Sequence, residues 1–142
     1  MPFKTRLDAV VKLRQRAEDA AKLALARARK DVAEAGAELE RLRARARQDD
    51  RAAGCAAEWE VRQRARDRAL AEIEKAEEAL RQLRAREAEA RNGYETAHRQ
   101  LEAVRRVAES KRAEMAREAD RKDRKTMDEI AGILHGRKKG AE

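Results

Sequence analysis

The sequence is poor in the residues that build the core of a globular protein. Its 142 residues include one phenylalanine, one tyrosine, one tryptophan and one proline, and the hydrophobic fraction of 42% is mostly alanine. A compact domain needs large apolar side chains, because their burial offsets the entropy lost when the chain is ordered. Alanine buries little surface, so these shortages exclude a fold built on a thick hydrophobic core.

Cysteine and long apolar runs are scarce as well. The single cysteine, Cys55, cannot form an internal disulfide and fits a reducing compartment. No run approaches the ~20 apolar residues of a membrane-spanning helix. The opening "MPFKTRLDAVVKL" lacks the uninterrupted apolar core of a signal peptide. We therefore expect a cytoplasmic protein with no transmembrane segment.

No group of residues in the sequence suggests a catalytic or cofactor site. The two histidines, His98 and His135, are far apart along the chain, Ser110 is the only serine, and no glycine-rich loop could cradle a phosphate. We predict a protein that is not an enzyme, with no catalytic residues, no cofactor, no metal and no small-molecule substrate.

The abundant residues favour long helices. Alanine, arginine, glutamate, leucine and lysine dominate, and 45% of the residues are charged, as is typical of coiled coils. Such polarity is also typical of disordered chains. The strong helix formers, together with a regular apolar pattern, favour the helical interpretation.

The apolar pattern predicts two helices with coiled-coil seams. In the second half of the chain, apolar residues recur at alternating steps of three and four, and Glu87 and Lys111 fill two positions of the same stripe. This stripe consists of Ile73, Ala76, Leu80, Leu83, Ala90, Tyr94, Ala97, Leu101, Val104, Ala108 and Met115. A looser stripe in the first half consists of Phe3, Leu7, Val10, Ala17, Ala21, Ala24, Ala28, Val32, Ala35, Leu39, Leu42 and Ala46. Arg14 interrupts it, and the two steps of four that begin at Ala24 predict a local phase shift.

Two places compete for the turn between the helices. Asn92–Gly93 is the stronger turn dipeptide, but the stripe passes through it without slipping. Around Asp49 and Gly54 the stripe is lost, and glycine is a common helix stop. We therefore predict an all-α fold, a single antiparallel coiled-coil hairpin. Helix one covers about 3–50, the turn about 51–57, helix two about 58–135, and a loose basic tail 136–142.

A hairpin with this turn pairs residues whose numbers add up to about 108 to 110. Leu39 then lies opposite Ala69 and Leu70, and Leu7 lies near Leu101. Residues after about 108 have no partner in the first helix, so the second helix overhangs.

The overhang ends in an apolar cluster. Met127, Ile130, Ile133 and Leu134 are spaced i, i+3, i+6, i+7, as on one face of a helix. The cluster either folds back near Phe3 or docks on another protein. We favour docking, because Phe3 and Leu7 already have partners on the second helix.

The positive charge is concentrated at the two ends of the chain. The net charge is +8, and residues 1–30 carry +6, residues 105–142 carry +4 and residues 31–104 carry −2. An antiparallel hairpin brings both termini to one basic end, which predicts an acidic partner surface. The alternative is a solvated charged face that only keeps the protein in solution.

The most specific blocks of sequence lie near the two termini. The closing block "DRKTMDEIAGILHGRK" has a basic stretch followed by Met-Asp-Glu, an apolar residue and alanine. The opening block "FKTRLDAVVKLRQRAEDAA" has an aromatic residue followed by leucine, valine and a Leu-Arg pair. Both blocks resemble the FliJ family of flagellar export proteins and its YscO-type counterparts in type III secretion. Trp59, just beyond the predicted turn, also matches some members.

The resemblance implies an antiparallel two-helix coiled coil similar to the central stalk of rotary ATP synthases. The family's termini are taken to enter the hexameric export ATPase and to promote assembly of its ring. Its coiled coil touches the cytoplasmic domain of the export gate, and export chaperones are further partners. The resemblance thus implies a location at the inner face of the cell membrane, as a peripheral protein.

The resemblance also assigns two sets of contact residues. The ATPase-facing set is Phe3, Leu7, Lys122, Lys125, Met127, Asp128, Glu129, Ile130 and Ile133. The gate-facing set near the turn is Leu39, Leu42, Arg45 and Trp59, without the exposed aromatics that better known members carry there. For Trp59, the alternative is packing against the tip of the hairpin.

Two other functions compete with this interpretation. Net charge of +8 suits non-specific binding to nucleic acid, but 28 acidic residues are interleaved with the basic ones and stacking aromatics are nearly absent, so nucleic acid is not expected. A self-associating scaffold would pair the overhang, from Lys111 to Leu134, with a second copy.

Overall fold

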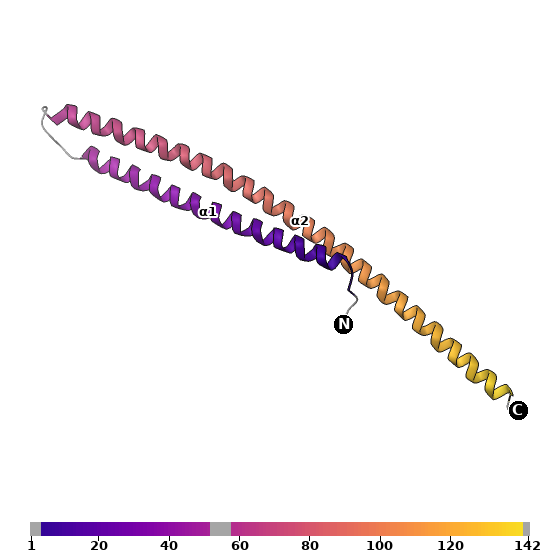
Figure 1. The fold of residues 1–142 in the computed structure, drawn as a ribbon. Coiled ribbons are helices and arrows are strands. Elements are labelled where there is room, and N and C mark those ends of the chain that lie inside the picture. The colour runs from indigo at the N-terminus through magenta and orange to yellow at the C-terminus, as the bar shows by residue number, and fades with distance from the viewer. Residues whose placement is uncertain (1–3, 52–57, 141–142) are drawn as a thin grey trace. The chain divides into compact units, whose positions relative to one another are not determined.

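The computed structural model describes residues 4–51 and 58–140. Phe3, residues 52–57 of the predicted turn, with Gly54 and Cys55, and residues 141–142 lie outside the described residues. The described part contains two helices, α1 (Leu7–Arg51) and α2 (Trp59–Gly140), and no strand. They run antiparallel and pack against each other (Figure 1), which confirms the all-α hairpin.

The helix boundaries agree with the predicted turn but not with the predicted end of the second helix. Asn92 and Gly93 lie inside α2, so the stripe decided correctly between the two candidate turns. α2 continues to Gly140, past residue 135 where the sequence predicted its end, and Arg137, Lys138 and Lys139 occupy its last turn. Cations there stabilise the negative end of the helix dipole. No helix in the described part is long and apolar enough to cross a membrane.

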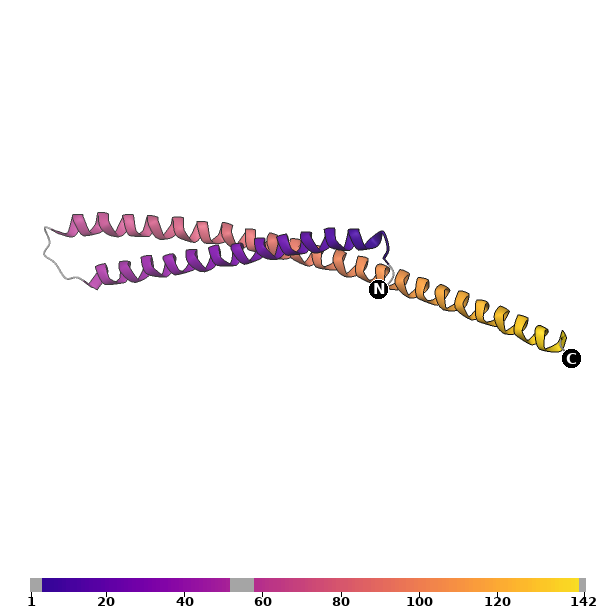
Figure 2. The ribbon, with the colours of Figure 1, turned by 60° about the horizontal axis from the view of Figure 1, so that its bottom comes forward.

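The chain divides into two compact units, which are described separately. One unit combines Met1–Arg16 with His98–Glu142, and the other is Ala17–Ala97. In each unit a segment of α1 lies beside a segment of α2, as Figure 2 shows for the length of the second unit.

The inner face of α2 matches the predicted stripe. Each apolar residue predicted from Ile73 to Met115 is buried or half-buried, and so is Glu87, whereas the neighbouring positions are mostly exposed. Leu101 is 0% exposed and is the most completely buried large side chain among the described residues. Lys111 is the exception, because it is exposed while the adjacent Arg112 is half-buried.

The inner face of α1 is more regular than the sequence predicted. Its buried and half-buried positions advance by strictly alternating steps of four and three: Leu7, Val11, Arg14, Glu18, Ala21, Leu25, Ala28, Val32, Ala35, Leu39, Leu42 and Ala46. Val10, Ala17 and Ala24, which were assigned to the seam, are exposed. The predicted phase shift was therefore wrong, since the stripe keeps its heptad period through Leu25.

The error has a physical cause: two charged residues occupy seam positions. Arg14 does not interrupt the stripe but belongs to it, and its guanidinium donates a hydrogen bond of 2.8 Å to Gln100 Oε1. Glu18 is only 7% exposed. A prediction that follows apolar residues avoids both positions and shifts by one residue to Val10 and Ala17. Long polar side chains can cover a seam with their methylene stems.

The register of the hairpin also differs from the prediction. The numbers of the polar pairs that join the helices show this. Arg43–Glu77 in one unit, and Gln15–Arg105 and Asp8–Arg112 in the other, add up to 120. Arg14–Gln100 adds up to 114, so all four pairs exceed the predicted 108–110. Leu39 accordingly lines a groove with Leu80, not with Ala69 or Leu70.

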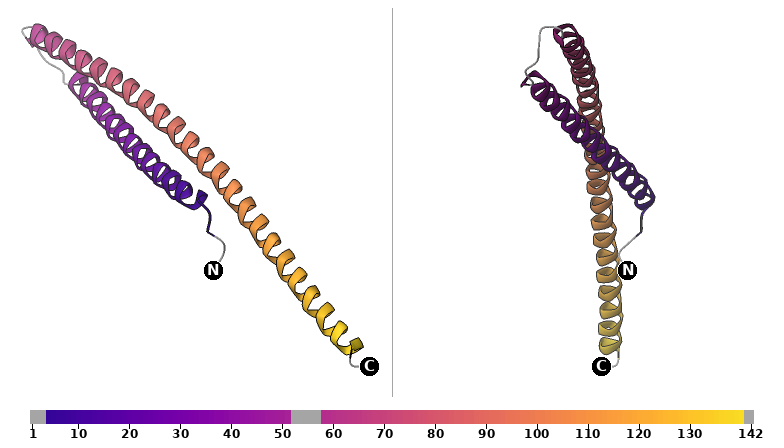
Figure 3. Two further views of the ribbon diagram at one scale, coloured as in Figure 1. Left: turned by 45° about the vertical axis from the view of Figure 1, so that its right-hand side comes forward. Right: turned by 90° about the vertical axis from the view of Figure 1, so that its left-hand side faces the viewer.

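The difference arises because the two helices do not end level at the turn. In the register of Arg43 and Glu77, the last residue of α1, Arg51, faces about residue 69 of α2. The first three turns of α2 therefore extend beyond the end of α1 (Figure 3). At the start of α1, Leu7 faces about residue 113, so the overhang of α2 begins later than predicted. All residues from 120 to 140 are exposed.

Candidate binding surfaces

The start of α1 is fixed to α2 by one carboxylate. Thr5 N–H donates to Asp8 Oδ2 at 2.9 Å, and Asp8 N–H donates to the Thr5 carbonyl at 3.1 Å, a reciprocal arrangement like a capping box. Arg112 of α2 donates a further hydrogen bond to Asp8 Oδ1. The backbone hydrogen bond from Thr5, helped by Arg112, lowers the pKa of Asp8 below its usual value. Asp8 thus caps the N-terminus of α1 and, through Arg112, also fixes the register of α1 against α2.

Beyond this anchor, α2 presents an exposed apolar surface that we name the terminal cluster: Met127, Ile130, Ile133 and Leu134. Their side chains are roughly half to two-thirds exposed; Ile133 is 61% exposed. Because they lie on a regular part of α2, they do not fold back onto the start of the hairpin. The structure leaves this face open to a partner.

The terminal cluster lies mostly off the continuation of the hairpin seam. The row of Leu101, Ala108 and Met115 continues to Lys122, Glu129 and Gly136. The second row, in which Arg112 and Ala119 are half-buried, continues to Thr126 and Ile133. Ile133 is thus the only large apolar residue on these continued rows, and the other three residues of the cluster fall between them. A longer α1 would meet mainly polar residues there.

The terminal cluster is surrounded by basic charge. Residues 121–140 carry seven lysines or arginines and three acidic residues, a net charge of +4. Lys122 and Lys125 precede the cluster and are exposed, as are Asp128 and Glu129 within it. Leu7, by contrast, is half-buried on the inner face of α1, so little of it is available to a partner. Of the residues predicted to face the ATPase, those from Lys122 to Ile133 therefore lie together and exposed on α2, whereas Leu7 is not part of this surface.

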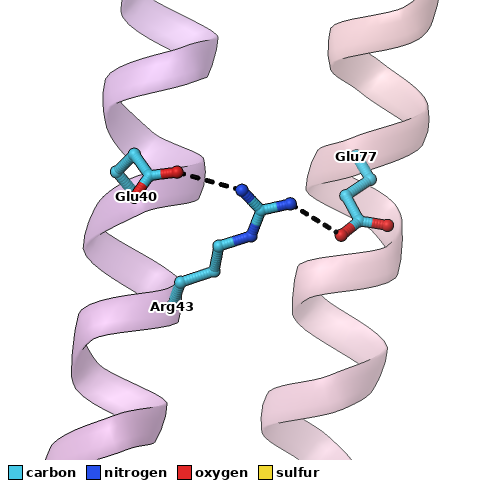
Figure 4. A network of polar contacts seen from close by, with 3 residues as sticks. All are labelled: Glu40, Arg43 and Glu77. Atoms are coloured by element: carbon cyan, nitrogen blue, oxygen red, sulfur yellow. Dashed lines mark hydrogen bonds and ion pairs between the residues drawn. The ribbon is translucent and has the colours of Figure 1, made fainter.

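The unit of residues 17–97 contains a second polar link between the helices. Arg43 Nη1 donates to Glu40 Oε1 at 2.9 Å, and Arg43 Nη2 donates to Glu77 Oε1 at 3.0 Å across the hairpin (Figure 4). The hydrogen bonds to Glu77 and Glu40 raise the pKa of Arg43. All three side chains are at least a third exposed, so water screens the bridge and it contributes little to stability. Its geometry fixes register more than stability.

The residues predicted to face the export gate separate in the structure. Leu39 is 4% exposed and belongs to the core, so the assignment of Leu39 to a contact surface was wrong. Leu42 is half-buried, and Arg45 is exposed. Trp59 is 64% exposed on the first turn of α2. The assignment came from the resemblance to the family, whereas the apolar pattern of the sequence had already placed Leu39 on the seam.

Trp59 lies in a groove that the sequence analysis missed. We name it the tip groove; its volume is about 300 Å³, and it is lined by Ala46, Asp49, Trp59, Arg62, Gln63, Ala65, Arg66, Ala69 and Leu70. Trp59, Arg62, Arg66 and Ala69 continue the stripe of α2 backwards from Ile73 at steps of three and four. That spacing was the signal available in the sequence. It was overlooked because arginines fill two of the four positions.

The described residues hold no arrangement suited to metal chemistry. No group of three or more histidine, cysteine, aspartate and glutamate side chains in residues 4–51 and 58–140 could hold an ion. What the structure presents instead is two surfaces for macromolecules, the terminal cluster and the tip groove.

A comparison with protein families identifies the kind of chain that carries these surfaces. A family model described as "Flagellar FliJ protein" matches residues 3–140. The chain belongs to the FliJ family. The match includes α1, α2 and both surfaces, and it confirms the resemblance seen in the opening and closing blocks of the sequence. FliJ membership implies a component of the flagellar export apparatus. Searches of curated proteins and of solved structures found no match to the chain.

Proposed function

We propose that this FliJ-family chain is a non-enzymatic, stalk-like component of a flagellar or type III export apparatus. It binds the hexameric export ATPase through the terminal part of α2 and promotes assembly and activity of the ring. A second contact, near Trp59, links it to the cytoplasmic domain of the export gate, and export chaperones are further partners. It acts in the cytoplasm as a peripheral protein at the inner face of the cell membrane.

The observation that carries the ATPase contact is the state of the terminal cluster. Four large apolar side chains are exposed on a helix whose seam positions have become mostly polar. An exposed apolar patch with a polar rim is typical of a protein–protein contact. Each such side chain contributes about 1.5–3 kcal/mol when fully buried, although association and ordering costs offset much of this gain.

The charge around the terminal cluster supports the same contact. Lys122 and Lys125 on one side, and Arg137, Lys138 and Lys139 on the other, surround the apolar residues with positive charge. Such charges accelerate the encounter with an acidic surface, and added salt weakens this attraction by screening it. We therefore expect the ATPase surface that receives the cluster to be apolar with an acidic border.

The proposal is tested by introducing one negative charge into the terminal cluster and comparing this variant with a matched control variant outside it. Ile133→Asp should reduce stimulation of the export ATPase at least about tenfold, because it introduces a carboxylate into the buried contact. Val107→Asp makes the same change at a side chain that is 52% exposed on α2 and lies outside the cluster, and it should leave stimulation intact. ATP hydrolysis is measured against the concentration of each variant.

A truncation after Asp120 complements the point variants. It removes the exposed end of α2 and keeps every inner-face position from Leu7 to Ala119. Circular dichroism should show an unchanged melting temperature for the truncated protein, while stimulation of the ATPase is abolished. Full stimulation by the truncated protein, or equal losses from the Ile133 and Val107 variants, would reject the proposal.

A further inference from the structure

Among the described residues, the first turns of α2 form half of a coiled-coil seam whose other half α1 does not supply. The seam positions Trp59, Arg62 and Arg66 lie beyond the level at which α1 ends, since Arg51 faces about residue 69. These positions line the tip groove together with Ala69. From Trp59 to Ala69 the seam is about 15 Å long at 1.5 Å per residue, or about three helical turns.

The shape of the groove matches a helix better than an extended strand. In the paired part of the same unit, the face that carries Leu80 and Ile73 is covered by α1. The tip groove is the same face, three turns earlier, with its apolar floor of Ala69, Leu70 and Trp59 still accessible; Leu70 is exposed. A helix laid into this groove would occupy the place that α1 leaves open.

The charge of the groove selects the chemistry of that helix. Residues 59–70 hold four arginines, at 62, 64, 66 and 68, against Glu60 and Asp67. Two of the arginines, Arg62 and Arg66, line the groove. Arg62 has only a loose ion pair with Glu58, at 3.7 Å, and Arg66 already has an interaction within the protein. A guanidinium carries five N–H donors, so each arginine can accept an additional carboxylate in a bidentate pair.

We propose that the tip groove binds an acidic amphipathic helix of a partner protein. Apolar residues of that helix pack on Trp59, Ala69 and Leu70, and its carboxylates pair with Arg62 and Arg66. Asp49 of α1 also lines the groove, and its carboxylate repels the acidic residues of the partner helix, so we expect these residues to lie towards Arg62 and Arg66. The inference rests on the gate contact of the proposed function in one respect: it states which kind of partner segment that contact takes.

The experiment uses Trp59, the single tryptophan of the chain, as a reporter inside the groove. The full-length protein is titrated with three short helical peptides that share their leucine positions and carry glutamate, glutamine or lysine elsewhere. We expect the glutamate peptide to shift the Trp59 emission to the blue and to bind most tightly, followed by the glutamine and then the lysine peptide. Added salt should weaken the binding of the glutamate peptide more than that of the other two peptides.

Matched variants test the role of the two arginines. Arg62→Glu with Arg66→Glu should weaken binding of the glutamate peptide at least about tenfold, because both charge pairs become repulsive. Arg64→Glu with Arg68→Glu makes the same change in net charge on the same turns but outside the groove, and should weaken binding less than about threefold.

Several outcomes would overturn the inference. These are equal binding of the glutamate and lysine peptides, equal losses from the two pairs of variants, an emission that no peptide changes, or a blue shift that depends on protein concentration without peptide. The last outcome would mark a second copy as the occupant. The titration uses neither ATPase nor gate, so its failure would leave the Ile133 and Val107 comparison standing, and failure of that comparison would not alter the titration.

Discussion

Two stretches of α2 are both helical but have opposite roles. Between Leu101 and Ala119 the heptad positions are mainly apolar and are covered, whereas between Asp120 and Gly140 most of the same positions are polar or glycine and every residue is exposed. The first stretch holds five alanines and no glycine, and the second holds one alanine and three glycines. Helix formation does not distinguish them, because both are rich in arginine and lysine, which favour the helix with or without a partner.

The difference teaches where each stretch uses its apolar residues. In the covered stretch they stabilise the hairpin, and the pairs Asp8–Arg112 and Gln15–Arg105 set its register. In the exposed stretch the large apolar residues, all but Ile133 off the continued seam, gather in the terminal cluster, which is exposed beyond the part of α2 that α1 covers. A residue of the first stretch should thus affect stability, and one of the second should affect binding.

The largest effect expected is that of Leu101→Ala. Leu101 is completely buried, and removing three carbon atoms from such a position costs about 2–4 kcal/mol, through lost transfer energy and the cavity that remains. Urea unfolding followed by circular dichroism measures the change. Leu134→Ala is the matched substitution in the terminal cluster, and its effect should remain within about 0.5 kcal/mol. Equal destabilisation by both would show that the terminal cluster packs on the hairpin in solution.

An effect of the opposite sign is expected at Glu18. Its side chain fills a seam position at 7% exposure, where a carboxylate loses much of its hydration. Glu18→Leu should therefore stabilise the hairpin by about 1 kcal/mol, while a polar seam residue's contribution to a unique register is lost. Glu34→Leu, at an exposed position of α1, should change stability by less than about 0.5 kcal/mol.

Unfolding and sedimentation together sharpen the comparison between the seam and the exposed surface. The Glu18 variant should melt higher than the wild type and sediment like it, because the added leucine is buried within the seam. A lower melting temperature would show that the interactions of Glu18 within the protein outweigh its desolvation.

The sequence was sufficient to predict the fold, the inner face of α2 and the terminal cluster. The stripe from Ile73 to Met115 identified the inner face of α2, and it excluded a turn at Gly93. The terminal cluster followed from spacing alone, and its exposure agrees with an overhang. These predictions succeeded because apolar side chains at heptad spacing leave little choice of face.

The register and the inner face of α1 could not be obtained in the same way. Both depend on charged side chains, Arg14 and Glu18 on the seam and Arg43–Glu77 between the helices, whose placement is decided by long-range geometry. The prediction also assumed that the helices end level at the turn. The tip groove was missed for the same reason, since it exists only because α2 begins about three turns beyond the end of α1.

The smallest effect concerns Asp8, and it depends on pH. Asp8→Asn keeps an acceptor for the Thr5 N–H but removes the charge that faces Arg112, so amides in the first turn of α1 should exchange with deuterium about twofold faster at pH 7.

Because folding lowers the pKa of Asp8, the stability that its carboxylate contributes is complete above the unfolded pKa of about 3.8 and is lost as the pH falls through the lower folded pKa. The difference in melting temperature between variant and wild type should therefore be constant from pH 7 to about pH 5 and vanish in strong acid. Asp123→Asn, at an exposed position after the seam, should show no difference at any pH. If the melting temperatures of Asp8→Asn and the wild type still differed below the folded pKa of Asp8, the stabilisation at the start of α1 would come from shape and hydrogen bonding and not from the ion pair with Arg112.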